Sequence, residues 1–208
     1  MFHNAEFFIR VYNNDSMEIL IIVLIIIGAL IGIWFAWGIL SPHIWEHPEY
    51  EVEAKEGKFE LRRYKDVKIL FTTTSKFNNA FSVLSSYIFG KNKEKEKIAM
   101  TSPVLTEMQN EDTMRMTFFV PKKYDDKEMP TPYSDEIKFS IQKGRDVAVI
   151  RFHGFMSEKK REKYLDKLLE ILERKNIKTK GSAFYMNYSD PFVPPPLRIN
   201  EIGIEIYL

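Results

Sequence analysis

A chain of 208 residues with nearly balanced charge and no cysteine excludes several classes of function. It has 30 Lys and Arg against 29 Asp and Glu, and leaving out Arg10, Glu6, Asp15 and Glu18 gives 29 against 26 for residues 41–208, a net charge of +3. We therefore expect no nucleic-acid-binding surface. The lack of cysteine excludes disulfides, thiolate ligands to metal or heme, and cysteine nucleophiles.

The N-terminal part differs from the rest of the chain. Residues 19–40 contain neither charge nor proline, and at ~1.5 Å per residue they can cross a hydrocarbon layer of ~30 Å. Trp34 and Trp37 lie near the end of this run, as is typical of the membrane interface. We predict a tail over residues 1–18, a transmembrane helix over residues 19–40 that contacts membrane lipid, and a linker over residues 41–48.

Two alternatives to a retained span are a cleaved signal peptide and a buried core helix. The apolar run is long for a signal peptide, and the segment before it has a net charge of −2. Gly28 and Gly32 form a GxxxG motif through which two copies of the helix could pair as a homodimer. Lys55 and Lys58 after the span, against Arg10 before it, favour a cytoplasmic location for the following domain.

The domain begins with alternating and β-branched segments that predict strands over residues 50–54, 59–64 and 67–74. Alternation in the second of these places Phe59, Leu61 and Arg63 on one face. A helix follows, for which Ser75 or Asn78 is a candidate N-cap and Gly90 the terminator. Its apolar stripe consists of Phe77, Ala80, Phe81, Leu84, Tyr87 and Ile88.

The second part of the domain repeats the first. Residues 139–147 match residues 59–67 at an offset of 80, and a second helix repeats the stripe of the first with Leu165, Leu168, Leu169 and Leu172. We predict an antiparallel α+β domain over residues 49–208, made of duplicated ββαββ-type units at about 58–120 and 137–208. The remaining strands are expected over residues 101–108, 113–120, 139–152, 183–188 and 202–207.

Catalytic and metal-binding motifs are hard to find in this sequence. No HExxH, Gly-x-Ser-x-Gly or P-loop pattern occurs. His153 is the one histidine inside the predicted domain, and a surface histidine on a strand is the preferred interpretation over a heme-iron ligand. His43 and His47 belong to the linker. For Glu201, hydrogen bonds that fix a loop are preferred over a catalytic role.

Five segments in order resemble the SOUL heme-binding family over roughly residues 47–208. They are Phe59–Tyr64, Tyr87–Gly90, Asn92, Ile98–Val104 and Arg198–Glu201. The resemblance implies a distorted antiparallel β-barrel flanked by two helices, with heme in a shallow apolar cleft between the first helix and the C-terminal loop.

Carried over to this sequence, the resemblance assigns one wall of the cleft to the first helix, with Phe77, Phe81, Leu84, Ser85 and Ile88. The other wall is the stiff segment 190–198, which has four prolines. It offers Phe192, Val193 and Leu197 as apolar contacts and Arg198 as a cation for the propionates. For Phe81, Leu84 and Ile88, core packing is the competing interpretation. The methionines at 100, 108, 114 and 116 are expected to pack in the core.

The sequence therefore predicts a membrane-anchored, non-catalytic protein that binds heme or another tetrapyrrole for buffering, trafficking or sensing. One alternative is a binding module for another amphipathic molecule, similar to gyrase-inhibitory-protein-like domains, which a buried carboxylate such as Glu201 or Glu60 facing the cleft would favour. Others are a tetrapyrrole-modifying enzyme, and an adaptor that docks a partner protein through the charged helix at residues 157–175.

Overall fold

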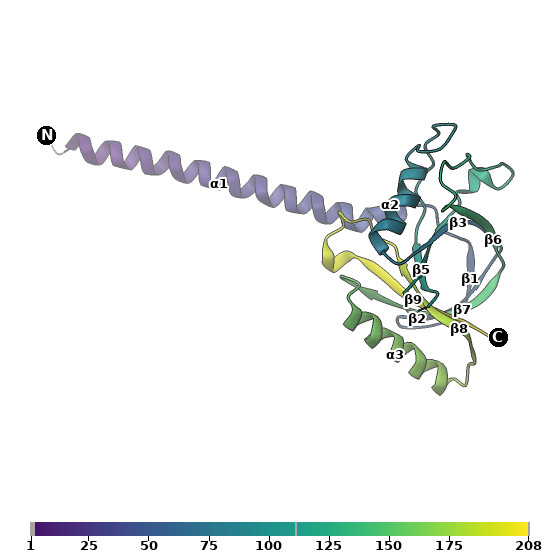
Figure 1. Cartoon of the computed structure of the whole chain (residues 1–208). Helices are drawn as coiled ribbons and strands as arrows, with labels where there is room; N and C mark the ends of the chain where they lie inside the picture. Colours follow the sequence, from purple (N-terminus) through teal and green to yellow (C-terminus); the bar gives the residue numbers. More distant parts are fainter. Residues whose placement is uncertain (1–2, 111, 208) are drawn as a thin grey trace.

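A long helix projects from a mixed helix and sheet domain in the computed structural model of the chain (Figure 1). The structure describes residues 3–110 and 112–207, with the side chains described from residue 17 onward. The helix, α1, spans His3–Leu40 and therefore begins well before the predicted span. The stretch Met17–His43, which consists of the rest of α1 and the short turn after it, is long and apolar enough to cross a membrane.

The remaining elements occur in the order expected for an α+β domain. The strands are β1 (Tyr50–Glu56), β2 (Phe59–Tyr64), β3 (Val67–Thr74), β4 (Val104–Met108), β5 (Met114–Phe119), β6 (Lys138–Gln142), β7 (Arg145–His153), β8 (Thr179–Asn187) and β9 (Ile199–Ile206). The helices are α2 (Phe77–Ile88) and α3 (Glu158–Arg174), with short 3₁₀ turns η1 (Ser41–His43), η2 (Lys122–Tyr124) and η3 (Pro195–Leu197).

All nine strands form one curled antiparallel sheet in the order β1-β2-β7-β9-β8-β4-β5-β3-β6. If β1 is left out, the other eight strands form two mirrored sets of four that meet at the β8–β4 pair. In this arrangement β8 corresponds to β4, β9 to β5, β7 to β3 and β2 to β6. Each half of the domain sequence therefore contributes one strand to the part of the sheet formed by the other half. The strand β2 of the first half pairs with β7 of the second, and β6 of the second half pairs with β3 of the first. The predicted fold class is confirmed.

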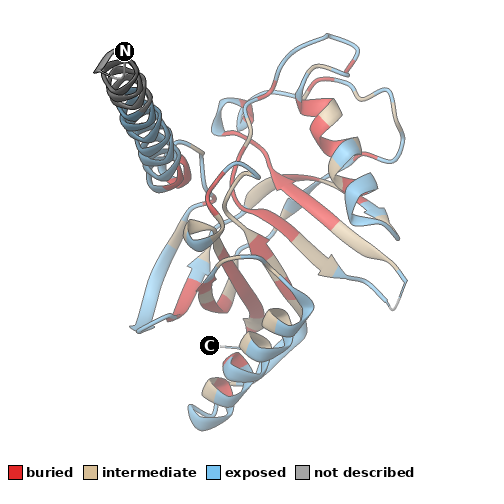
Figure 2. Ribbon diagram, turned by 90° about the vertical axis from the view of Figure 1, so that its left-hand side faces the viewer, coloured by how far each residue is buried: buried red, intermediate tan, exposed pale blue. Residues whose placement is uncertain are grey.

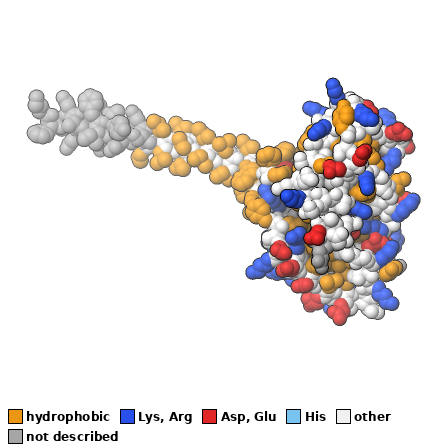
Figure 3. Space-filling model, in the orientation of Figure 1, with side chains coloured by type: hydrophobic (Ala, Val, Ile, Leu, Met, Phe, Trp, Pro, Cys, Tyr) orange, Lys and Arg blue, Asp and Glu red, His pale blue; other side chains and the backbone are white. Residues whose placement is uncertain are grey.

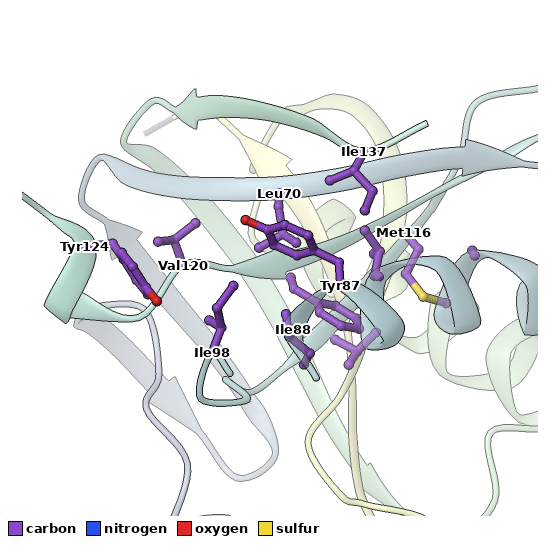
Figure 4. Close-up of a cluster of buried hydrophobic side chains, with 12 residues drawn as sticks. Leu70, Tyr87, Ile88, Ile98, Met116, Val120, Tyr124 and Ile137 are labelled. Carbon is purple, nitrogen blue, oxygen red and sulfur yellow. The ribbon is translucent and has the colours of Figure 1, made fainter. Parts of the chain in front are cut away.

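Three apolar clusters hold the sheet and its helices together. The helix α2 covers one half of the sheet, where Leu84, Ile88 and Met116 belong to a buried cluster (Figure 4). The helix α3 covers the other half over Phe152 and Ile202, and the buried residues lie on the faces of the elements that meet (Figure 2). Alternate residues of the same strands, such as Val147 and Val149, form a third cluster on the sheet face turned away from both helices.

Several predicted boundaries were wrong for local physical reasons. The N-cap of α2 is Lys76, without a side-chain hydrogen bond, rather than Ser75 or Asn78. Residues 139–152, expected to repeat residues 59–72, form the two strands β6 and β7, and in the tight turn between them the N–H of Gly144 donates to Asp66 Oδ1 at 2.8 Å. The strand expected from residue 101 begins at Val104, because Pro103 has no N–H for a ladder.

Residues 41–48 are ordered and packed against the domain. Ser41 and Pro42 are buried, and Glu46 forms an isolated bridge with Thr101. The ring nitrogens of His47 lie 3.0 Å from the carbonyl oxygens of Ser102 and of Pro42. The chain thus passes from α1 into the sheet through a segment that contacts the domain at several points.

Candidate functional site

The proline-rich loop at residues 190–197, expected to form one wall of the ligand site, lies against the C-terminal end of α1. The indole Nε1 of Trp34 donates a hydrogen bond of 2.6 Å to the carbonyl oxygen of Phe192. One turn further along α1, a Cβ added to Gly38 would lie 2.7 Å from Cδ of Pro194 and 2.8 Å from Cδ1 of Leu197. The glycine permits a close approach of helix and loop.

Arg198 braces this loop from the other side. Its Nη2 donates to the carbonyl of Pro191 at 2.6 Å and its Nε donates to that of Val193 at 3.0 Å. The guanidinium carbon also lies 4.7 Å from the ring centre of the exposed Phe155. These contacts hold the Phe192 side chain on a rigid support with 76% of its surface exposed, while Val193 beside it is fully buried.

The residues predicted on α2 divide into accessible and enclosed positions. Phe77 is 41% exposed and Phe81 is partly buried, so both reach the surface. Leu84, Ser85 and Ile88 are buried, and the Ser85 hydroxyl donates to the carbonyl of Ser82 at 3.3 Å. The enclosed residues pack against the sheet, as the core interpretation of the stripe anticipated.

The predicted helix wall and loop wall have different neighbours. The helix α2 contacts β3 and β5, whereas η3 of the loop contacts α1 and β7.

A cavity of about 340 Å³ lies elsewhere, between the residues after α1 and the strands β3 and β6. It is lined by Glu46, His47, Pro48, Glu49, Lys65, Asp66, Val67, Lys68, Thr101, Phe119, Val120, Lys122, Asp125 and Ile141. A second cavity, of about 10 Å³ and lined partly by Tyr64 and Phe184, is too small for a ligand. Neither cavity is lined by any of the nine predicted contact residues.

The metal-ligand candidates have separate positions. His153 is exposed at the end of β7, and its backbone carbonyl accepts a hydrogen bond of 2.9 Å from Lys160 Nζ. Met116 is fully buried in the cluster beneath α2, whereas Met108 is 39% exposed. Among the described residues, no group of three or more His, Cys, Asp or Glu side chains is arranged to hold a metal ion.

A buried ion network is the feature that sequence reasoning missed. Arg62 makes a two-pronged pair with Glu201, in which Nη1 and Nη2 each lie 2.7 Å from a carboxylate oxygen. The same carboxylate accepts from Arg151 Nε at 2.8 Å and from the Tyr188 hydroxyl at 2.6 Å. Arg62 also donates to Glu60 at 2.8 Å. The side chains of Arg62 and Glu201 are 1% and 0% exposed.

The charges of this network hold one another in their ionised forms. Burial raises the pKa of Glu201, but the hydrogen bonds and positive charge of Arg62 outweigh burial and leave that pKa below its ordinary value. Burial raises the pKa of Tyr188 well above its ordinary value, so its hydroxyl stays protonated and donates to Glu201. Glu201 is thus neither a loop-fixing acceptor of backbone N–H groups nor an unpaired carboxylate.

The sequence holds one signal of this network, at Glu201, whereas the alternation around Arg62 points away from it. Glu60 and Arg62 alternate with Phe59 and Leu61, which normally indicates a solvated face. Here Phe59 and Leu61 pack under α3, and the charged pair points to the inside of the curl. Glu201 belongs to the last strand, which is otherwise mostly apolar. A carboxylate in such a strand indicates a cationic partner, because acidic side chains are almost never fully buried unless they are paired.

The fold and these sites define a class: a curled, duplicated antiparallel domain with a helix over each half and a surface loop rich in apolar groups. The model of the SOUL heme-binding protein family matches residues 45–205, and the chain belongs to this family. It is similar to heme-binding protein 2 of Mus musculus, with 27% identity over 71% of this chain and 78% of the relative. It is also similar to heme-binding protein 2 of Homo sapiens, with 29% identity over 62% of this chain and 67% of the relative.

Solved structures with low sequence identity share the fold. The C-terminal domain of EcmrR is similar with a TM-score of 0.51 and 10% identity, covering 76% of this chain and 98% of that one. A hydrolase from Listeria innocua is similar with a TM-score of 0.52 and 12% identity, covering 74% of this chain and 94% of that one. At such identities the likeness concerns the fold alone.

Proposed function

We propose that this protein binds heme or a related tetrapyrrole without catalysis, close to a membrane in which α1 is the anchor. Membership of the SOUL heme-binding family over residues 45–205 is the observation that carries the proposal. The relatives of mouse and human are named heme-binding proteins, which supports the same ligand here. Buffering, trafficking or sensing of heme are the roles that suit a binding module of this kind.

The accessible members of the predicted site favour a shallow contact. Phe192 exposes 76% of its surface, and the part-buried Leu197 and Arg198 lie at the base of the same loop. Phe77 exposes 41% of its surface but lies on α2, whose neighbours are β3 and β5. A flat macrocycle gains most from flat apolar side chains with a nearby cation for its carboxylates. Val193 would support the contact at the loop from beneath, whereas Leu84, Ser85 and Ile88 are enclosed between α2 and the sheet and would not touch the ligand.

The cationic-amphiphile alternative has less support. It calls for a buried carboxylate left to neutralise a ligand, whereas Glu201 is paired with two arginines and a tyrosine. Glu60 is paired as well, with Arg62 and with Lys55 at 2.7 Å. A cation would therefore have to compete with guanidinium groups that are already bound.

The proposal is tested by titrating the full-length chain in lipid nanodiscs with hemin and following the Soret band against empty nanodiscs. We expect a distinct band that Phe192→Ala and Arg198→Gln weaken. Tyr133→Ala, an exposed control, should have no effect, and His153→Ala should have little. Lys122→Ala tests the 340 Å³ cavity that this lysine lines. A spectrum identical to that with empty nanodiscs would overturn heme binding, and a loss of binding in Lys122→Ala alone would move the site to that cavity.

A further inference from the structure

We propose that the loop at residues 190–197 is a second membrane contact, whose tip enters the bilayer interface beside α1. The inference rests on the anchoring role of α1 proposed above and extends it from a single helix to a helix and a loop. It follows from the depth of the loop along the helix, from the pairing of its backbone groups and from the chemistry of its exposed surface.

The depth follows from the hydrogen bond between Trp34 and Phe192. If the hydrocarbon layer starts at Ile19, just after the charged Glu18, a thickness of ~30 Å ends about 20 residues later, near Gly38. Trp34 lies four residues before that point, and its indole is bonded to the carbonyl of Phe192 at 2.6 Å. Gly38 itself packs against Pro194 and Leu197. The loop therefore lies at the boundary of the hydrocarbon layer, where indole rings prefer to reside.

The backbone of the loop tip is fully paired, as entry into lipid requires. The carbonyls of Pro191, Phe192 and Val193 accept hydrogen bonds from Arg198, Trp34 and again Arg198. The N–H of Phe192 donates to Asp190 Oδ1 at 2.7 Å, and that of Val193 donates to the Asp190 carbonyl at 3.3 Å. Proline has no N–H to satisfy. Irregular backbone is excluded from lipid because unpaired polar groups cost several kcal/mol each. The backbone of residues 191–193 avoids this cost, and the unpaired polar atom of the loop is Oδ2 of Asp190, which is buried in the protein.

The exposed surface of the tip suits a lipid interface. Phe192 exposes 76% of its surface and the nearby Phe155 exposes 58%, while the cation of Arg198 lies over the Phe155 ring. Hydrophobic side chains continue from α1 onto the adjoining part of the domain, with Lys and Arg side chains next to them (Figure 3). Aromatic side chains flanked by cations are typical of segments that lie in the boundary between acyl chains and headgroups. The partner of this surface is therefore a lipid bilayer.

The natural absence of cysteine allows a direct test in the full-length chain. Single-cysteine variants Phe192→Cys, Ile25→Cys and Tyr207→Cys are labelled with a small fluorophore and reconstituted into phosphatidylcholine vesicles. In one set the lipids carry bromine near the ester end of the acyl chains, which quenches a probe located in the interface. Ile25 reports on α1, and Tyr207 lies near the C-terminus, at the end of the domain far from α1 (Figure 1).

We expect brominated lipid to quench the probe at residue 192 strongly and the probe at residue 207 hardly at all, with residue 25 protected from water. A protected residue 25 with an unquenched residue 192 would overturn the loop contact and leave the anchor intact. Equal quenching at residues 192 and 207 would also overturn it, as non-specific adsorption. A water-exposed residue 25 would overturn both the membrane anchor and the loop contact. Heme binding is decided independently of this experiment, by the hemin titration described above. Should Phe192→Cys alter the circular dichroism spectrum, Pro191→Cys carries the probe at the same tip.

Discussion

Single side chains balance the buried charges on the strands β2, β7 and β9. Arg62 bridges Glu60 and Glu201, so two strands that are not adjacent in the sheet, β2 and β9, are tied together across β7. An arginine suits this position because its planar group satisfies both carboxylate oxygens at once. Since burying such ions is unfavourable, the network is expected to specify the register of β2, β7 and β9 more than to add stability.

Removing one member of the network should be strongly destabilising. Arg62→Met leaves Glu201 buried with only Arg151 and Tyr188, and we expect a loss of about 3–5 kcal/mol in the free energy of unfolding. Urea denaturation in nanodiscs measures it. The neighbouring Arg63 is the matched control, because its side chain is 53% exposed where it pairs with Glu53 and Asp146. Arg63→Met should cost no more than about 1 kcal/mol. Equal losses in both variants would contradict the buried role of Arg62.

The same network predicts how stability depends on pH. The pKa values of Glu201 and Glu60 are lower in the folded protein than in ordinary carboxyls. The stability that they contribute is therefore complete above the unfolded value of ~4.3 and is lost as the pH falls through the lower folded values. The urea midpoint should fall steeply below about pH 4.3. The slope should be shallower in Arg62→Met, and an unchanged slope would show that other carboxylates dominate.

The contact between α1 and the proline-rich loop depends on one small residue. A side chain at Gly38 would overlap Pro194 and Leu197, whereas a Cβ at Gly32 meets nothing within 4 Å. Gly38→Val should therefore separate the loop from the helix and break the hydrogen bond from Trp34 to Phe192. Hydrogen exchange of the Phe192 and Val193 amides should accelerate in Gly38→Val and remain unchanged in Gly32→Val. Unaltered exchange in both variants would show that the loop holds its shape without the helix.

How much of these elements could be predicted depends on the range of the interactions that form them. The strands and both domain helices follow from local alternation and apolar stripes, and their positions are nearly as expected. Local patterns say nothing of Gly38 packing on Pro194, because that contact joins segments more than 150 residues apart. Local patterns also predict the apolar stripe of α2, but they do not distinguish its enclosed residues, such as Leu84, from accessible ones, such as Phe77. Arg62 was missed for a similar reason, since its partner belongs to the last strand.

The molecule as a whole is built so that neither half of the sheet is complete alone. Because β6 pairs with β3 and β2 pairs with β7, each half contributes a strand to the other. Because this pairing is non-local, we expect the domain to behave as one cooperative unit. The nine-stranded sheet is thus expected to unfold in a single transition despite its two separate helix-covered clusters.

This cooperativity can be measured with one core substitution. Phe152 is fully buried in the cluster under α3, and Phe152→Ala should cost about 3–5 kcal/mol. Hydrogen exchange of the slowest amides in β5, on the other half, should accelerate to the same extent as those in β7. Faster exchange confined to β7 and β9 would show that the halves unfold independently, and Leu169→Ala, at an exposed position of α3, serves as the control.

The unbroken passage from α1 through the buried Ser41 and Pro42 into the sheet has an optical consequence. If α1 and the loop at residues 190–197 both contact the bilayer, every copy of the protein would hold its domain at the same angle to the membrane. The plane of a bound porphyrin would then also have one fixed angle to the membrane. In aligned lipid multilayers, hemin held this way would absorb Soret light to different extents in two perpendicular polarisations. A pigment on a freely swivelling domain would show no such dichroism.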